Sequence, residues 1–449
     1  MSLPSPGGRT MTERGAPQLL GPWMTAALVV GGIIGSGIFM LPVALAPLGP
    51  NAIAGWFVSG LGALCIAFAL ARLVTADGEG LQAYIERGFG PTAGFIVAWC
   101  FLVSTWAANA ALAIAAASAT SRVVPVFGGA SGVALLAVGF IVFLSAINAA
   151  GARAMGRLAV VTTLLKLLPL LAVIVLLAIG KARGRPIEPL ASVPLTIDNV
   201  SVAVALTLFA LTGFENALAP VGKVRDPLRN IPRAMIAGTA FVAVLYLLSS
   251  IAVLLLLPLA QATASAAPFA DALVSEWGES AAILAALGMA IAAFGALNGG
   301  IMVAGEAGYS MALRGDLPPA LARTQRSNTP VVSQFASSAI VILLVFFNSS
   351  RTTANLFQFV VLLSTVAVLL VYLVGSLEAL RLRPTPIAAI PILIGIGFAL
   401  FAFYGSGLEA NLWGLTLLLG GLLVRALMHR VNSSSTIPVT EAAPAATPE

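Results

Sequence analysis

Twelve long apolar runs follow one another along this chain between residues 21 and 430. Each is close to the length of about 20 residues that an α-helix needs to cross a lipid bilayer. Only 9% of the residues are charged, whereas a soluble domain carries about 25%. A membrane β-barrel would show short alternating segments instead. We therefore predict an all-α polytopic membrane protein surrounded by the bilayer.

The spans are predicted near residues 21–45, 50–73, 92–121, 132–151, 158–181, 198–220, 234–258, 280–311, 330–348, 355–380, 387–405 and 412–430. An even number of spans places both termini on one side of the membrane. Arg and Lys gather in the connections on that side, so the positive-inside rule makes it the cytoplasm. Residues 1–20 lack the apolar core of a signal peptide, and residues 431–449 have a disordered composition. Both segments are therefore predicted to be cytoplasmic tails.

The net charge of +6 does not indicate a nucleic-acid partner, because the basic residues are scattered over the ends of the apolar runs. Cys65 and Cys100 fall inside such runs, which favours buried thiols over a disulfide. His429 is the only histidine, so no metal site and no cofactor are predicted. No catalytic motif stands in a suitable context, and the chain is not expected to be an enzyme.

The first apolar run is interrupted by Gly31-Gly32-Ile33-Ile34-Gly35-Ser36-Gly37-Ile38-Phe39. Glycine weakens a helix by about 1 kcal/mol relative to alanine. In a membrane, broken backbone persists only where protein buries it or where it lines a cavity. The sequence therefore predicts a broken helix that surrounds something polar.

A second interruption, Leu211-Thr212-Gly213-Phe214-Glu215-Asn216, lies in the sixth run. Spans one and six correspond if the chain contains two five-span halves, 21–181 and 198–380, followed by two extra helices within 387–430. An odd number of spans per half inverts the second copy. Paired interruptions at matching positions predict a transporter binding site near the middle of the membrane.

The two sides of the first interruption offer opposite partial charges. The amides of Ser36, Gly37 and Ile38 begin a new half-helix and suit a carboxylate. The carbonyls near Gly32 and Ile33 can accept from an ammonium group. One broken span thus matches both ends of an amino-acid zwitterion. Close helix packing through small residues is the alternative, and the second interruption favours the binding site.

Ionisable residues at membrane depth are functional candidates, and three stand out: Lys166, Glu215 and Glu306. Lys166 is interpreted as a proton carrier or as a fixed cation in place of a bound sodium ion. The alternative is a structural tether to the carbonyls of a broken helix. Glu215 follows the second interruption and suits proton sensing or coupling, or else it caps the broken backbone.

Polar residues on two further spans allow two interpretations. Thr105 and Asn109 share one face of the third span, and Ser364 lies in the tenth. These side chains either line a pocket or form hydrogen bonds between helices. A membrane channel or a purely structural membrane protein is the different-class alternative. A channel would need polar groups along its whole length, whereas here they cluster at one depth.

Four segments resemble the amino acid–polyamine–organocation transporter superfamily: 31–42, 84–91, 213–216 and 226–232. The similarity extends over essentially the whole chain, and it is greatest to the basic amino acid/polyamine antiporters of the arginine/agmatine type. This resemblance implies the leucine-transporter-type fold, with broken helices one and six, and transport by alternating access. It also implies a homodimer.

The resemblance further implies roles for individual residues. Ser36 and Gly37 match the positions that hold the substrate carboxylate, and Ile33 matches the carbonyl that meets the amino group. Phe209 falls where the antiporters of the arginine/agmatine type have a tryptophan that covers the substrate. The remaining matches are a backbone contact at Thr212, side-chain-pocket positions at Thr105, Asn109 and Ser364, and a pH-responsive glutamate at Glu215.

Three positions depart from those antiporters. Gly32 replaces an asparagine, Gly300 replaces a second pocket tryptophan, and Lys166 replaces a small residue. A tryptophan would stack on a guanidinium group, so its loss predicts a wider pocket that is less suited to arginine. A lysine at this position resembles exchangers and proton-coupled members elsewhere in the superfamily.

The sequence thus predicts a secondary active amino-acid transporter in the cell inner membrane. Exchange of an amino acid for another amino acid or a polyamine ranks first. A proton-coupled permease or exporter of neutral amino acids is the alternative. The partners implied are a small amino acid or amine and, for the coupled mechanism, protons carried by Lys166 or Glu215.

Overall fold

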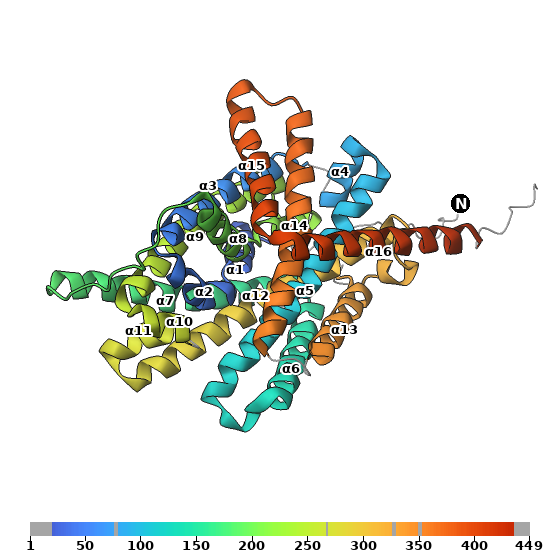
Figure 1. The fold of residues 1–449 in the computed structure, drawn as a ribbon. Coiled ribbons are helices and arrows are strands. Elements are labelled where there is room, and N and C mark those ends of the chain that lie inside the picture. The colour runs from blue at the N-terminus through green and yellow to red at the C-terminus, as the bar shows by residue number, and fades with distance from the viewer. Residues whose placement is uncertain (1–19, 76–79, 266–267, 326–328, 349–352, 435–449) are drawn as a thin grey trace, which may run out of the picture.

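The computed structural model describes residues 20–75, 80–265, 268–325, 329–348 and 353–434, which are almost entirely helical (Figure 1). Ten of the described helices are long and apolar enough to cross a membrane. Two shorter apolar helices, Ile197–Leu211 and Val331–Phe346, occupy the predicted sixth and ninth spans. The all-α polytopic fold is therefore confirmed. The predicted tails lie outside the described residues, except at their inner ends.

The spans have the following bounds: α1 (Pro22–Ile33) with α2 (Gly37–Leu45), α3 (Pro50–Ala71), α5 (Pro91–Val123), α6 (Gly129–Ala149), α7 (Ala152–Ala182), α8 (Ile197–Leu211), α9 (Pro227–Leu256), α12 (Glu279–Leu313), α13 (Val331–Asn348), α14 (Thr353–Arg381), α15 (Pro386–Gly405) and α16 (Gly407–Ser434). Five of them begin with proline. Proline suits the first helical position because the amide that it lacks would be unpaired there. The helix α16 continues past the predicted boundary at residue 430.

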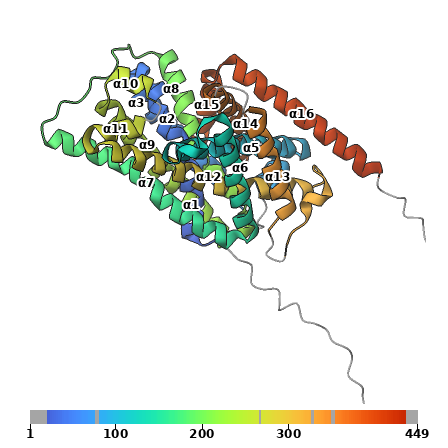
Figure 2. The same cartoon turned by 90° about the horizontal axis from the view of Figure 1, so that it is seen from below.

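Helices α5 and α12 form the centre of the bundle. Their most apolar windows are 72% and 78% buried, against 6% for α16. In Figure 2 most of α16 stands apart from the other helices. The most apolar windows of α5 and α12 are thus the most buried of the ten, and α1 packs on α7, α9 and α12.

Both predicted interruptions are present. In the first span, residues 34–36 are non-helical and separate α1 from α2. In the sixth, α8 ends at Leu211, and Gly213 follows with φ +117°. Only glycine adopts that conformation without strain. The sequence predicted a span to residue 220. After the break, however, the backbone forms the 3₁₀ turns η4 (Phe214–Leu218) and η5 (Val221–Lys223) instead of an α-helix.

The connections carry short helices. The amphipathic α4 (Leu81–Phe89) lies in the connection between α3 and α5. Helices α10 (Leu259–Ala264) and α11 (Pro268–Trp277) join spans seven and eight and were not predicted. Their short, mixed sequences lack a spanning run, which is why hydropathy alone did not separate them from the loop.

The chain enters α1 at one end of the bundle, which we call the proximal end. There the Leu20 amide donates to the Lys223 carbonyl at 2.7 Å, and the Leu20 carbonyl accepts from the Arg225 amide at 3.0 Å. These two bonds fasten the start of span one to the end of span six. The start of span one and the end of span six are thus joined by backbone hydrogen bonds at the proximal end.

Candidate functional site

The two interruptions touch each other through their glycines. A methyl group added to Gly32 would lie 3.1 Å from the Gly213 carbonyl oxygen and 2.7 Å from Nδ2 of Asn216. A methyl group on Gly213 would lie 2.7 Å from the carbonyl carbon and oxygen of Gly32. Backbone meets backbone here because neither residue has a side chain. The breaks of the two spans therefore lie in direct contact, and the Gly213 amide and carbonyl are themselves bonded to Glu215 and to the Asn216 amide.

The α2 side of this region presents helix amides. Amides in the first turn have no carbonyl partner within their own helix, and this turn begins at Ser36 and Gly37. Ser36 and Ile38 are buried. The Phe209 ring lies over Gly37, so that a methyl group there would be 3.0 Å from Cε1 of Phe209. The geometry suits an anion held by amides under an aromatic ring.

The α1 side presents carbonyls, and several already accept hydrogen bonds. The Ile33 carbonyl accepts from the Tyr246 hydroxyl at 3.0 Å and from the Gly35 amide at 2.8 Å. Tyr246 was not among the predicted site residues. Its signal was a tyrosine in the middle of a span, where the hydroxyl must find a partner. The Ile33 carbonyl, which was predicted to accept from the substrate amino group, thus already accepts from two protein donors.

Lys166 on α7 is fully buried and binds the first interruption directly. Its amino group donates to the carbonyl of Gly31 at 2.5 Å and to that of Ile34 at 2.7 Å. These carbonyls flank the break and would otherwise be buried without donors, which is costly. The structure thus shows the tether that was one of the two interpretations of Lys166. The role of Lys166 in carrying protons stays a prediction.

Glu215 on η4 binds the second interruption in a similar way. Its Oε2 accepts from the Gly213 amide at 2.9 Å and from the Tyr372 hydroxyl on α14 at 2.7 Å. The Phe214 ring stacks on Tyr372 with centroids 5.0 Å apart. Glu215 therefore caps the broken backbone and joins it to α14. Tyr372, like Tyr246, was absent from the predicted site.

Asn109 and Gly300 lie against each other. A methyl group on Gly300 would be 1.9 Å from Oδ1 of Asn109, so the amide fills the space that a side chain at position 300 would need. The prediction that Gly300 simply widens the pocket omitted this contact. Nδ2 of Asn109 is buried and has no hydrogen-bond partner among the residues that the structure describes. An unsatisfied buried donor of this kind is costly and suits a ligand acceptor.

The other three candidate side chains are bonded to protein. The Thr105 hydroxyl donates to the Phe101 carbonyl one turn back at 2.7 Å, and the Thr212 hydroxyl donates to the Phe209 carbonyl at 2.8 Å. Ser364 exchanges hydrogen bonds with Ser104, including one from Oγ of Ser364 to the Ser104 carbonyl at 3.1 Å. Ser364 thus links α14 to α5, as the helix-contact interpretation states.

Two acidic residues nearer the proximal end also have defined places. Glu306 forms an ion pair with Lys223. Glu378, near the end of α14, is buried. Its carboxyl group lies against Gly88 of α4, and one oxygen is 3.4 Å from Nη1 of Arg381. Helix α4 covers this end of the span, which hydropathy along the span alone does not show.

A protein-family model described as amino acid permease matches residues 20–415 of the chain. The chain is 26% identical over 400 residues to the putrescine transporter PotE of Haemophilus influenzae, which covers 86% of this chain and 92% of that protein. It is 29% identical over 393 residues to a putative arginine/ornithine antiporter of Bacillus subtilis, covering 80% and 84% respectively. It is 26% identical over 403 residues to the cadaverine/lysine antiporter of Escherichia coli, covering 86% and 90%.

Proposed function

The chain belongs to the amino acid permease family, and on that premise we propose that it exchanges an amino acid for an amine or a second amino acid across the membrane. It is a multi-pass membrane transporter and not an enzyme. The observation that carries the proposal is the contact between Gly32 and Gly213. This contact places the end of α1, in span one, directly against the break in span six.

The substrate backbone is bound by the broken spans in this proposal. The amides of Ser36, Gly37 and Ile38 hold the carboxylate. The carbonyls of Gly32 and Ile33 accept from the amino group, and the Ile33 carbonyl also accepts from the Tyr246 hydroxyl. Phe209 covers the substrate, which its position over Gly37 supports. A decarboxylated amine lacks the first contact and keeps the second, so one site can serve both members of an exchanged pair.

Asn109 and Gly300 set the side-chain preference in this proposal. The unpaired Nδ2 of Asn109 is a donor and therefore suits an acceptor or a neutral polar group of the substrate. The names of the three relatives point to basic amino acids and diamines. A panel of labelled substrates distinguishes the arginine/agmatine pair from other basic pairs.

Proton-coupled transport of neutral amino acids is the second candidate. Lys166 favours it, because a fully buried amino group that bridges the break can transmit a change of protonation to both carbonyls. We further propose that the proximal end faces the cytoplasm and that the protein lies in the inner membrane. The excess of basic residues in the proximal connections supports this orientation. A homodimer remains an implication of the resemblance.

Counterflow in proteoliposomes tests the proposal. The purified protein is reconstituted with or without internal arginine, lysine, ornithine, putrescine or leucine, and uptake of each labelled compound is measured. Exchange predicts that uptake of a basic substrate rises several-fold with an internal partner and is independent of an imposed pH gradient. Uptake of leucine that follows the pH gradient and ignores the internal solute would replace exchange by the proton-coupled alternative.

A further inference from the structure

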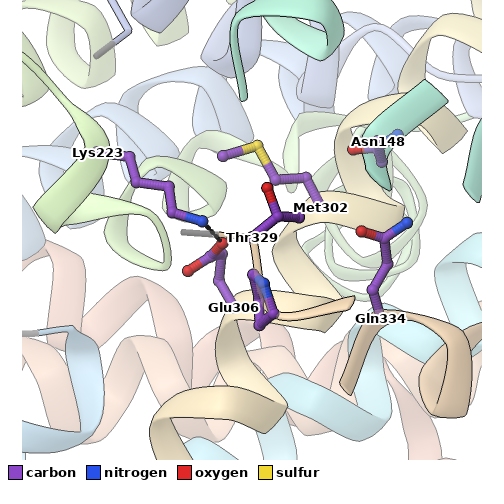
Figure 3. Close-up of a pocket in the computed structure, with 7 residues that line it drawn as sticks. Asn148, Lys223, Met302, Glu306, Thr329 and Gln334 are labelled. Carbon is purple, nitrogen blue, oxygen red and sulfur yellow. Dashed lines mark hydrogen bonds and ion pairs between the residues drawn. The ribbon is translucent and has the colours of Figure 1, made fainter. Parts of the chain in front are cut away.

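A polar pocket lies at the proximal end, away from the two interruptions. It is enclosed by η5, α6, α12 and the segment that leads into α13. Figure 3 shows the side chains that line it, which include Asn148, Lys223, Met302, Glu306, Thr329 and Gln334. The exchange proposed above does not use this pocket.

The pocket holds one carboxylate and one ammonium group. Glu306 from α12 and Lys223 from η5 form an ion pair inside it, and their side chains are only 9% and 13% exposed. A buried carboxylate needs a cation or several donors. In this conformation the protein supplies that cation from its own chain. The Glu306 carboxylate is therefore paired with an alkylammonium group, which is that of the Lys223 side chain.

A second acceptor in the pocket has no donor. Nδ2 of Asn148 donates to Oδ1 of Asn298 at 3.0 Å and to the Leu144 carbonyl at 2.9 Å. The orientation of this amide is fixed, because Nδ2 of Asn298 in turn donates to the Met155 carbonyl at 3.2 Å. Oδ1 of Asn148 is left buried and without a partner among the described residues.

The second amide in the pocket is oriented in the same sense. Nδ2 of Asn148 and Nε2 of Gln334 both face away from the ion pair, and Nε2 of Gln334 donates to the Ser145 carbonyl at 2.7 Å. In Figure 3 the amide oxygens of Asn148 and Gln334 are turned toward the side on which Lys223 meets Glu306. The pocket thus offers acceptors to a ligand with several N–H donors.

Lys223 also connects this pocket to both broken spans. Its carbonyl accepts from the Leu20 amide at the start of span one, and it ends the 3₁₀ segment of span six. Glu306, by contrast, belongs to the central helix α12. The ion pair therefore fastens the proximal ends of both broken spans to the centre of the bundle.

We propose that this pocket is a second binding site, for the primary ammonium group of an amine or amino-acid substrate at the proximal face. Glu306 and Oδ1 of Asn148 accept from the substrate ammonium, which takes the place of the Lys223 side chain. Lys223 is then released from α12, and the proximal ends of spans one and six are free to move. The inference rests on the proposed function for the identity of its ligand.

Thermal unfolding in detergent tests the site without transport. The purified full-length protein is titrated with putrescine, and with butane-1,4-diol as the uncharged probe of the same length. In Lys223→Met the carboxylate is vacant, so putrescine should raise the unfolding midpoint by more than in the wild type. Glu306→Gln lacks the carboxylate, so putrescine should raise its unfolding midpoint no more than that of the wild type and by less than that of Lys223→Met. The diol should shift none of the proteins.

The matched control is Glu86→Gln. Glu86 forms an ion pair with Arg314 at the same end of the bundle but does not line the pocket. This variant should show the wild-type shift with putrescine. If Lys223→Met does not fold, Lys223→Gln serves the same purpose, since it also removes the ammonium group. Equal shifts in wild type, Lys223→Met and Glu306→Gln would overturn the second site.

Sided transport gives an independent readout. With substrate supplied at the proximal face, Glu306→Gln should raise the half-saturating concentration about tenfold, as loss of a charge-assisted hydrogen bond predicts. Lys223→Met should lower it, because the competing ammonium is gone. If the ion pair is purely structural, both variants should change the half-saturating concentration in the same direction. If exchange is observed but the variants do not differ in half-saturating concentration or in putrescine shift, only the second site is wrong. If the putrescine shifts differ between the variants but no exchange is observed, only the proposed function is contradicted.

Discussion

Gly213 lies against Gly32 so closely that a methyl group added to Gly213 would stand 2.7 Å from the carbonyl carbon of Gly32. Gly213 also has φ +117°, where a side chain is strained whatever the space. We expect Gly213→Ala to lower the free energy of unfolding by about 1–3 kcal/mol and to abolish substrate binding. Thermal unfolding and binding of labelled substrate measure the two effects.

The control for this substitution is Gly397→Ala. Gly397 lies inside α15, and a methyl group there would meet nothing within 4 Å. Alanine favours the helix over glycine by about 1 kcal/mol, so this variant should bind substrate normally and unfold no earlier than the wild type. Normal binding by Gly213→Ala would contradict the role given to the contact between the two breaks.

The contact between Gly37 and Phe209 should be visible as coupling between two substitutions. In Gly37→Ala the new methyl group would be 3.0 Å from the Phe209 ring, so the ring must shift and uptake should fall. Gly37→Leu should abolish uptake while the protein still inserts and folds. In Gly37→Ala/Phe209→Leu the smaller side chain leaves room, and the half-saturating concentration should rise by less than the two single effects combined. Strict additivity would mean that Phe209 does not cover the substrate.

Lys166→Met separates a tether from a proton carrier. The thioether side chain keeps most of the volume but leaves the carbonyls of Gly31 and Ile34 without their donor. The free energy of unfolding should fall by about 1–3 kcal/mol. A proton carrier predicts that accumulation driven by a pH gradient is lost while exchange survives. If accumulation and exchange fall by the same factor, Lys166 acts only through the backbone that it holds.

Glu215→Gln tests proton sensing at the second interruption. A glutamine oxygen can still accept from the Gly213 amide and the Tyr372 hydroxyl, so the geometry is kept and only the titratable charge is removed. The dependence of exchange on pH should therefore become flat between pH 5 and 8. Tyr372→Phe is the comparison, because it keeps the carboxyl group and should keep a pH dependence. A normal pH profile in Glu215→Gln would leave Glu215 with its capping role alone.

The positions of the spans and of both interruptions could be predicted from local sequence. A run of about 20 apolar residues has few alternatives in a bilayer, and a glycine such as Gly213 weakens a helix wherever it stands. The length of the sixth helix could not be predicted. Its second half forms 3₁₀ turns in which Glu215 binds Tyr372, a residue of another span, and a single run of sequence does not show such a partner.

The roles of single polar residues could be predicted only in part from the sequence. Lys166 and Ser364 each had two interpretations in the sequence, and in each case the helix-contact interpretation corresponds to bonds in the structure. The sequence of one span shows on which face of the helix a polar side chain lies, but not which group it will bond. The partner is set by the rotation and crossing of neighbouring helices, which no single span encodes.

The sequence by itself determined that this chain is a membrane-embedded helical transporter with two broken spans, because hydropathy and glycine act locally on the backbone. The tertiary structure decided which groups meet: Gly32 with Gly213, Lys166 with the carbonyls of the first break, and Lys223 with Glu306. Each pair comes from different segments of the chain. Buried polar groups must find donors and acceptors within the protein, and only packing of the whole bundle determines which ones they find.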